Sequence, residues 1–245
     1  MTEQRATSGR DRRFVLKAAL AGGAAAVLAP GVFLIAETQA REPAAAASTA
    51  QRWGLLIDVS RCAEGCTRCV DSCRAEQGCE DRGPGAADPQ WIRQIVASDP
   101  QGGATITLPV MCQHCAEAPC VDVCPTGASF HRADGIVLVD RHLCIGCRYC
   151  VMACPLGARF FVDRDLQDQR PATPRGKGTA EGCTLCVHRI DAGQRPACVE
   201  ACPGAMVFGD LNDADSPIRQ ALARHPVTRL RPDLRLGNGV QYQSL

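Results

Sequence analysis

The stretch CIGCRYCVMACP, residues 144–155, has four cysteines separated by two, two and three residues and ends in proline. A loop of this kind can bring three thiolates to one face of an iron–sulfur cube while its backbone N–H groups point at the inorganic sulfides. Gly146 allows the chain to approach such a cube closely. In this spacing the fourth cysteine, Cys154, serves a different cluster. The stretch therefore predicts a protein that is folded around 4Fe-4S clusters.

Two other parts of the chain repeat this pattern with a longer middle interval. The second cysteine group is Cys112, Cys115, Cys120 and Cys124 before Pro125, and the fourth group is Cys183, Cys186, Cys198 and Cys202 before Pro203. The three groups end in similar sequences, CPTGA from residue 124, CPLGA from residue 154 and CPGA from residue 202. Repeated endings of this kind indicate duplication of one structural unit.

The first cysteine group departs most from the pattern. Its members are Cys62, Cys66, Cys69 and Cys73. Its first interval has three residues instead of two, and Arg74 stands where the other groups have proline. Sixteen of the 17 cysteines thus predict four 4Fe-4S clusters, or three if the first group is degenerate. Cys79 is left over, and we interpret it as a spare thiol, with a substitute cluster ligand as the alternative.

Other roles for the cysteines fit their spacing less well. Tetrahedral zinc sites would use pairs of cysteines, and disulfides are common in exported proteins, but neither explains triplets followed by Cys-Pro. No CxxCH sequence for covalent haem occurs. No glycine-rich nucleotide motif or catalytic constellation accompanies the cysteines, so electron transfer without catalysis is the predicted role. His114, between two cysteines, could tune a cluster through a hydrogen bond, although we interpret the five histidines as surface or neighbouring groups.

The composition predicts an unusual core. The chain has 46% hydrophobic residues but only 4% aromatic residues, and its formal net charge is +1. We expect a loop-rich α+β fold of duplicated bacterial 2[4Fe-4S] ferredoxin-like units with the clusters as its interior. Short strands are predicted at residues 53–59, 91–97, 104–110 and 135–140, with short helices at 120–124 and 150–154 that end before proline. A polar surface linker is expected at 163–182, and a helix capped by Ser216 at 217–224.

The first forty residues resemble a twin-arginine signal. The sequence DRRFVLK, residues 11–17, precedes a weakly apolar stretch rich in alanine and glycine. Glycine and proline weaken the alternative interpretation as a membrane anchor. Clusters are inserted where thiols stay reduced, so a protein exported with its metal needs an exporter of folded proteins. We therefore expect residues 1–40 to be a signal peptide, 41–52 a linker, 53–211 the four-cluster region and 212–245 a C-terminal tail, with a periplasmic location.

The four groups in this order resemble the four-cluster ferredoxin subunits of the NrfC, PsrB and DmsB type, which accompany molybdopterin oxidoreductases and quinone-reactive membrane proteins. Within that family, four stretches are similar to the DsrO subunits of the sulfite-reduction-associated Dsr (DsrMKJOP) membrane complex. They are RCAEGC from residue 61, PVMCQHC from 109, CPTGASFHRADGIVLVD from 124 and RGKGTAEGCTLCVHR from 175. The resemblance covers residues 53–211.

This resemblance implies that each cluster takes cysteines from two groups, with groups one and four forming one half and groups two and three the other. Cluster 1 would use Cys62, Cys66, Cys69 and Cys202, and cluster 2 would use Cys183, Cys186, Cys198 and Cys73. Cluster 3 would use Cys112, Cys115, Cys120 and Cys154, and cluster 4 would use Cys144, Cys147, Cys150 and Cys124. Cluster 1 departs most from the family pattern because the interval between Cys62 and Cys66 is longer.

The implied partners are an NrfD-type (DsrP-like) membrane subunit and a multihaem (DsrJ-like) cytochrome c in dissimilatory sulfur metabolism. The chain would pass electrons between a periplasmic redox partner and the quinone-interacting membrane subunit, without a substrate of its own. Two alternatives remain. One is the electron-transfer subunit of a periplasmic polysulfide, nitrite or molybdopterin-type reductase, and the other is a free-standing soluble ferredoxin or a non-redox metal module.

Overall fold

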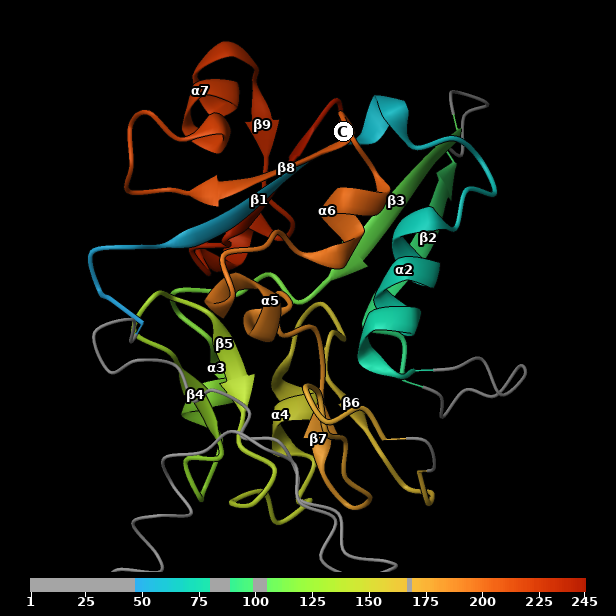
Figure 1. The fold of residues 1–245 in the computed structure, drawn as a ribbon, viewed down its shortest axis with the longest axis vertical. Coiled ribbons are helices and arrows are strands. Elements are labelled where there is room, and N and C mark those ends of the chain that lie inside the picture. The colour runs from blue at the N-terminus through green and yellow to red at the C-terminus, as the bar shows by residue number, and fades with distance from the viewer. Residues whose placement is uncertain (1–46, 80–88, 99–104, 167–168) are drawn as a thin grey trace, which may run out of the picture. The chain divides into compact units, whose positions relative to one another are not determined.

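The structure, a computed structural model, describes residues 47–79, 89–98, 105–166 and 169–245 (Figure 1). The chain divides into two units, residues 1–42 and residues 43–245. The first unit, and with it the predicted twin-arginine signal, lies outside the described residues. Within the described ranges, no helix is both long enough and apolar enough to span a bilayer.

The largest sheet joins strands from both ends of the described chain. Its order is β8-β1-β10-β9, with β1 at Trp53–Asp58, β8 at Met206–Asp210, β9 at Val227–Thr228 and β10 at Val240–Gln243. Strand β1 pairs antiparallel with β8 and parallel with β10, so it has a neighbour on each side. Leu55 and Ile57 of β1 are fully buried as a result. This sheet closes one side of the cysteine-containing core.

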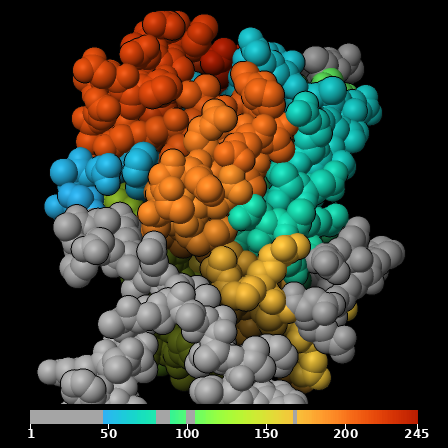
Figure 2. Space-filling view, in the orientation of Figure 1, coloured from blue at the N-terminus to red at the C-terminus, as the bar shows by residue number. Residues whose placement is uncertain are grey.

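A hairpin and several short helices complete the part that contains cysteine groups one and four. The hairpin strands are β2 at Ile92–Ser98 and β3 at Thr105–Met111. The 3-10 turn η2 at Val59–Arg61 follows β1, and α2 at Arg68–Gln77, α5 at Val187–Asp191 and α6 at Ala197–Ala201 follow in order. Helix α2 packs against α6, which brings groups one and four together; the two segments lie side by side in Figure 2.

Groups two and three share the remaining elements. Helix α3 at Pro119–Asp122 contacts α4 at Tyr149–Ala153, and each is one short turn of helix that ends before Cys-Pro. Two small antiparallel ladders flank them, β4 at Ser129–His131 with β5 at Val137–Val139, and β6 at Phe160–Phe161 with β7 at Ala180–Glu181. The α+β, ferredoxin-type fold class predicted from the cysteine pattern is confirmed.

The predicted strands and helices are present with shifts of one or two residues at most of their ends. Helix α7, Pro217–Arg224, begins as expected: the Ser216 hydroxyl accepts a hydrogen bond from the amide of Arg219 at 3.4 Å. Two segments differ from the expectation. Residues 163–182 end in β7, where Glu181 is buried, so they are not wholly surface linker. Residues 212–245 contribute β9, α7 and β10, and β10 lies inside the main sheet.

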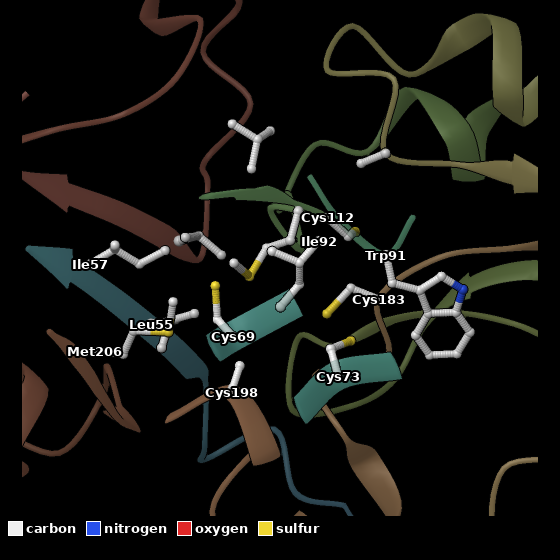
Figure 3. Packing of buried hydrophobic residues seen from close by; sticks show 14 of the residues in the cluster. Leu55, Ile57, Cys69, Cys73, Trp91, Ile92, Cys112, Cys183, Cys198 and Met206 are labelled. Atoms are coloured by element: carbon white, nitrogen blue, oxygen red, sulfur yellow. The ribbon is translucent and has the colours of Figure 1, made fainter. Parts of the chain in front are cut away.

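The core joins apolar side chains to cysteines. One cluster of buried residues contains Leu55, Ile57, Trp91 and Met206 together with Cys69, Cys73, Cys112, Cys183 and Cys198 (Figure 3). The cysteine side chains come from α2, from the loop after β3, and from the segments around α5 and α6. This arrangement is the one expected for a chain with few aromatic residues.

Candidate metal centres

Four cysteines line one small cavity between groups two and three. They are Cys112, Cys115, Cys120 and Cys154, and Pro119, Leu156 and Arg159 also line the cavity. Burial, together with the neighbouring thiolates, raises the pKa of Cys115 to about 12. The four sulfur-bearing side chains therefore border one enclosed space.

A second small cavity lies beside the other cysteines of the same two groups. Its lining includes Cys124, Cys144, Cys147 and Cys150, with Ile145 and Arg148. Cys150 is buried while Cys147 is exposed, so this cavity is the more superficial of the two. The guanidinium of Arg148 lies 3.9 Å from the centre of the Phe161 ring, which fixes the loop between Cys147 and Cys150.

The remaining eight cysteines of the four groups form two further sets in the other half. Burial raises the pKa of Cys69 to about 12, with Cys202, Cys62 and Cys66 as its charged neighbours. Cys73, by contrast, has Cys183, Cys198 and Cys186 around it, and burial raises its pKa as well. In Figure 3 the side chains of Cys73 and Cys183 lie next to each other. Cys69 and Cys73 of α2 thus have different cysteine neighbours, while Cys198 has both Cys186 and Cys69 near it.

The residue before the second cysteine of each group has the same unusual backbone. Gly65, His114, Gly146 and Leu185 all have positive φ, between 44° and 72°. This left-handed residue turns the loop so that the first two cysteines can face one space. The first group keeps this geometry because its extra residue lies upstream of Gly65. Its longer interval is therefore compatible with the loop that the other groups form.

Gly146 was expected from the sequence to let the chain approach a cluster closely, and its surroundings in the structure are crowded. A Cβ atom at this position would collide with the carbonyl oxygen of Gly178, and the φ of +72° would strain any other residue. The loop of group three consequently packs directly on the backbone that leads into β7.

Backbone amides point at several of the sulfurs. The amide of Ser129 donates to Cys124 Sγ and that of Ala158 to Cys154 Sγ, both at 3.3 Å. The amide of Leu185 donates to Cys183 Sγ at 3.4 Å. Burial opposes ionisation of Cys124, but the amides of Ser129, Thr126 and Ala128 and the Thr126 hydroxyl outweigh it and lower its pKa. Such donors suit thiolates that bind metal.

The donor set fits clusters better than single ions or disulfides. All 17 cysteines are free thiols. Among the described residues, no three His, Cys, Asp or Glu donors converge on one point as they would around zinc. In a 4Fe-4S cluster each thiolate binds a different iron, so its ligands surround a cavity instead of converging. Two sets of four cysteines, each lining one cavity, are consistent with that arrangement.

His114 is a buried residue, with 2% of its surface exposed. Its Nδ1 accepts a hydrogen bond from the amide of Val137 at 3.1 Å, which places the proton of the neutral ring on Nε2. Burial, with the positive charges of Arg159 and Arg52, lowers its pKa to about 3. Nε2 is buried and has no partner among the described residues. The expected hydrogen bond to a cluster remains a prediction.

Cys79 follows the left-handed cap Gly78 at the end of α2. Burial raises its pKa to about 12, and its strongest charged neighbours are Arg175, Glu181 and Arg141, not a set of cysteines. Glu181 in turn binds Arg175 at 2.7 Å and the Trp91 Nε1–H at 3.1 Å. Cys79 thus borders a polar network, and its interpretation as a spare thiol stays a prediction.

Arg159 was not predicted from the sequence as part of the site, yet it is buried against the thiols of groups two and three. One feature of the sequence could have indicated its burial: Arg159 is a charged residue inside the apolar run ARFFV, which begins directly after CPLG.

Comparison with known proteins agrees with this chemistry. The 4Fe-4S dicluster domain family matches residues 104–211. An Hdr-like menaquinol oxidoreductase iron–sulfur subunit from Archaeoglobus fulgidus is 38% identical over 96% of this chain and 97% of that protein. A tetrathionate reductase subunit from Salmonella typhimurium is 39% identical over 81% of this chain and 76% of its own length. Protein NrfC from Escherichia coli is 41% identical over 74% of this chain and 75% of its own. The chain therefore belongs to the NrfC- and DmsB-like family of 4Fe-4S ferredoxin-type electron-transfer subunits of oxidoreductase complexes.

Proposed function

We propose that this chain relays electrons through four 4Fe-4S clusters between a periplasmic redox partner and a quinone-interacting membrane subunit. The observation that carries the proposal is that eight cysteines line two cavities, four around each, while the other eight lie together in the other half of the fold. When bound, each cluster accepts and returns one electron. The chain's own residues hold the clusters, exclude water from them and supply hydrogen bonds to their sulfurs.

The proposed ligand sets follow these neighbourhoods. Cluster 1 is held by Cys62, Cys66, Cys69 and Cys202, and cluster 2 by Cys73, Cys183, Cys186 and Cys198. Cluster 3 is held by Cys112, Cys115, Cys120 and Cys154, and cluster 4 by Cys124, Cys144, Cys147 and Cys150. The shared left-handed turn before the second cysteine supports cluster 1 in particular, because Gly65 provides it despite the longer interval.

Metal analysis of the full chain, purified without oxygen, tests the number of clusters. We expect about sixteen iron and about sixteen acid-labile sulfide atoms per chain, with spin-coupled EPR signals after reduction. A value of about twelve irons would mean that only three clusters form, and the assignment of cluster 1 would be withdrawn because the first group is the most divergent. Zinc in place of iron would overturn the proposal.

We further propose that the chain is the DsrO-type subunit of a Dsr-like complex in dissimilatory sulfur metabolism. Its partners would be an NrfD-type, DsrP-like membrane subunit and a DsrJ-like multihaem cytochrome c. Support comes from the stretches quoted above and from similarity along nearly the whole chain to a subunit named for menaquinol oxidation.

The second candidate is the electron-transfer subunit of a periplasmic reductase. It is supported by the 39% identity to a tetrathionate reductase subunit and the 34% identity to an arsenate respiratory reductase subunit. Purification of the native complex through a tag on this chain distinguishes the two. A membrane subunit together with a multihaem cytochrome favours the first candidate, a molybdopterin subunit favours the second, and an isolated chain overturns both.

Export by the twin-arginine route completes the proposal. It rests on the sequence DRRFVLK and on the need to insert clusters before export. Replacing Arg12 and Arg13 together by lysine should retain the cluster-loaded protein in the cytoplasm, while Arg5→Lys with Arg10→Lys should not. Normal export of the Arg12 and Arg13 double variant would contradict this route.

A further inference from the structure

Arg159 is a buried cation placed among cysteines of two proposed clusters. Only 3% of its surface is exposed, and it directly precedes β6. Its Nη2 lies 3.7 Å from Cys120 Sγ and 3.4 Å from the hydroxyl of Ser129. The amide of Ser129 in turn donates to Cys124 Sγ. Arg159 therefore contacts the cluster 3 set directly and the cluster 4 set through Ser129.

The charge of Arg159 is not balanced by a carboxylate. Among the described residues, no acidic side chain lies within ion-pair distance of it, and its buried Nε has no hydrogen-bond partner. Glu181, the buried acid that lines the same small cavity, is bound by Arg175 and Trp91. An unpaired buried cation is costly, so anions must compensate it when the protein is loaded. The available anions are cysteine thiolates and the clusters that they hold.

Those thiolates belong to both neighbouring sets. Burial by itself would lower the pKa of Arg159, and the thiolates of Cys112, Cys120 and Cys150 outweigh it and raise that pKa. Cys112 and Cys120 belong to the proposed cluster 3, and Cys150 belongs to cluster 4. One guanidinium thus interacts with two proposed clusters.

The local backbone holds Arg159 in this position. The amide of the preceding residue, Ala158, donates to Cys154 Sγ at 3.3 Å. On the other side is Gly182, where a Cβ atom would meet the Ala158 carbonyl oxygen at 2.6 Å and Arg159 Cδ at 3.6 Å. Gly182 is therefore needed for the close packing that buries the arginine stem.

The other two proposed clusters lack an equivalent group among the described residues. Arg68, near Cys202, is exposed to solvent, where its charge is screened. Arg189, near Cys186, is bound to Glu76 at 3.0 Å and to Glu200 at 2.5 Å, so its charge is largely balanced.

We propose that Arg159 raises the reduction potentials of clusters 3 and 4 above those that their cysteine ligation alone would give. Reduction adds one electron and one negative charge to a cluster, with no atom transferred and no bond broken. A fixed cation in a buried site stabilises that added charge, and net charge and hydrogen bonding are known determinants of cluster potential. The inference rests on the proposed ligand sets but not on the identity of the partners.

The test uses the full, cluster-loaded chain in a potentiometric titration followed by EPR. Arg159→Met removes the charge and the N–H donors, Arg159→Lys keeps the charge, and Arg159→Gln keeps an N–H donor without charge. Arg93→Met is the matched control, because Arg93 lies nearby, donating to the carbonyl oxygen of Leu156 and resting over Phe160, without a contact to a cysteine sulfur among the described residues.

We expect Arg159→Met and Arg159→Gln to lower two of the four midpoint potentials by at least the equivalent of a tenfold change in equilibrium constant, about 59 mV for one electron. Arg159→Lys should retain most of the wild-type value, and Arg93→Met should shift all potentials by less. The shift should persist at high salt because the site is buried.

Unchanged potentials in fully loaded Arg159→Met or Arg159→Gln, or equal shifts of all four clusters, would overturn the proposal. The proposal would also be overturned if Arg159→Gln kept the wild-type potentials while Arg159→Lys shifted them as much as Arg159→Met. Hydrogen bonding, instead of charge, would then be the cause. If Arg159→Met does not retain its iron, the Lys and Gln pair decides the question. If the wild-type chain holds four intact clusters but binds no membrane subunit or redox partner, the proposed function is contradicted. The proposal for Arg159 is then still tested by the potentials of the variants.

Discussion

Cys73 and Cys79 are both buried, one within α2 and the other just after it, yet their neighbours differ. Cys73 has three cysteines of group four around it, whereas Cys79 faces Arg175, Glu181 and Arg141. We predict that Cys73→Ser loses about one cluster, or roughly four irons per chain, because serine replaces one of its four thiolates. Iron and sulfide analysis of the purified variants measures this.

Cys79→Ser is the matched control for that variant. It should retain the wild-type iron content, since the strongest charged neighbours of Cys79 are Arg175, Glu181 and Arg141 instead of a set of cysteines, although Cys79 also lies near Cys73. If Cys79→Ser loses a cluster and Cys73→Ser does not, Cys79 is the ligand and the assignment of cluster 2 must be changed.

Gly146 and Gly65 provide a second comparison between single residues. Both have φ of +72°, but a Cβ atom at Gly146 would collide with the Gly178 carbonyl oxygen, whereas one at Gly65 meets nothing within 4 Å. Gly65→Ala should cost about 1 kcal/mol of unfolding free energy from backbone strain. Gly146→Ala should cost more, about 2–4 kcal/mol, because the loop must also move away from β7.

Thermal unfolding of the loaded proteins, followed by their visible cluster absorbance, compares the two variants. Equal losses would mean that the loop of group three does not pack on Gly178 as described.

At the level of elements, helix α2 is joined to α5 and α6 by a group of charged side chains. Glu76 accepts from His188 at 2.8 Å and from Arg189 at 3.0 Å, and Arg189 also binds Glu200. Burial by itself would raise the pKa of Glu76, but the hydrogen bonds and charges of His188 and Arg189 outweigh it and lower that pKa. The stabilisation is therefore present above the ordinary carboxyl pKa of 4.5 and is lost as the pH falls below it.

Glu76→Gln should accordingly lower the unfolding free energy by about 1 kcal/mol at neutral pH. Glu200→Gln, which removes the more exposed partner, should cost less, about 0.5 kcal/mol. Denaturant unfolding at neutral pH measures both, and a larger loss for Glu200→Gln would show that Glu76 does not join the helices.

The sequence predicts most elements because their signals are local. Runs rich in apolar or β-branched residues mark β1 and β3, and each Cys-Pro marks the end of a short helix. Strand β10 has only four residues, and its place beside β1 depends on a parallel pairing between positions far apart in the chain, Leu55 with Val240. Likewise, the burial of Arg159 results from contacts among three segments that are far apart in the chain, so no local pattern predicts it.

For the cysteines, too, some features are predicted from local sequence and others are not. The spacing predicts which residues bind metal, and the exchange of the fourth cysteine between groups follows from the resemblance to a family. The left-handed residue before each second cysteine explains why these loops share a shape, although two of the four positions hold His114 and Leu185 instead of glycine. Since those side chains tolerate positive φ poorly, the metal and the packing around it must stabilise the loop.

For the molecule as a whole, the clusters should contribute a large part of the stability. Without them, two cysteine-lined cavities remain unfilled. Cavities in a core lower stability in proportion to their volume, and bound metal adds binding free energy to folding. Chelation of iron under reducing, anaerobic conditions should therefore lower the denaturant concentration at the unfolding midpoint.

The stability of this apoprotein should also fall as the pH rises above about 9. Burial raises the pKa of Cys112 to about 11 and that of Cys69 to about 12, against an ordinary value of 9.0. Between these values the unfolded chain loses thiol protons that the folded chain keeps, so each such thiol lowers the unfolding free energy by about 1.4 kcal/mol per pH unit. Denaturant titrations at pH 8 and pH 10, with reductant present, measure the loss.

The loaded protein is the control, because its ligand thiols have no protons to lose and its stability should change less over the same interval. Equal pH dependence of the two forms would mean that the cysteines are not buried as thiols in the apoprotein.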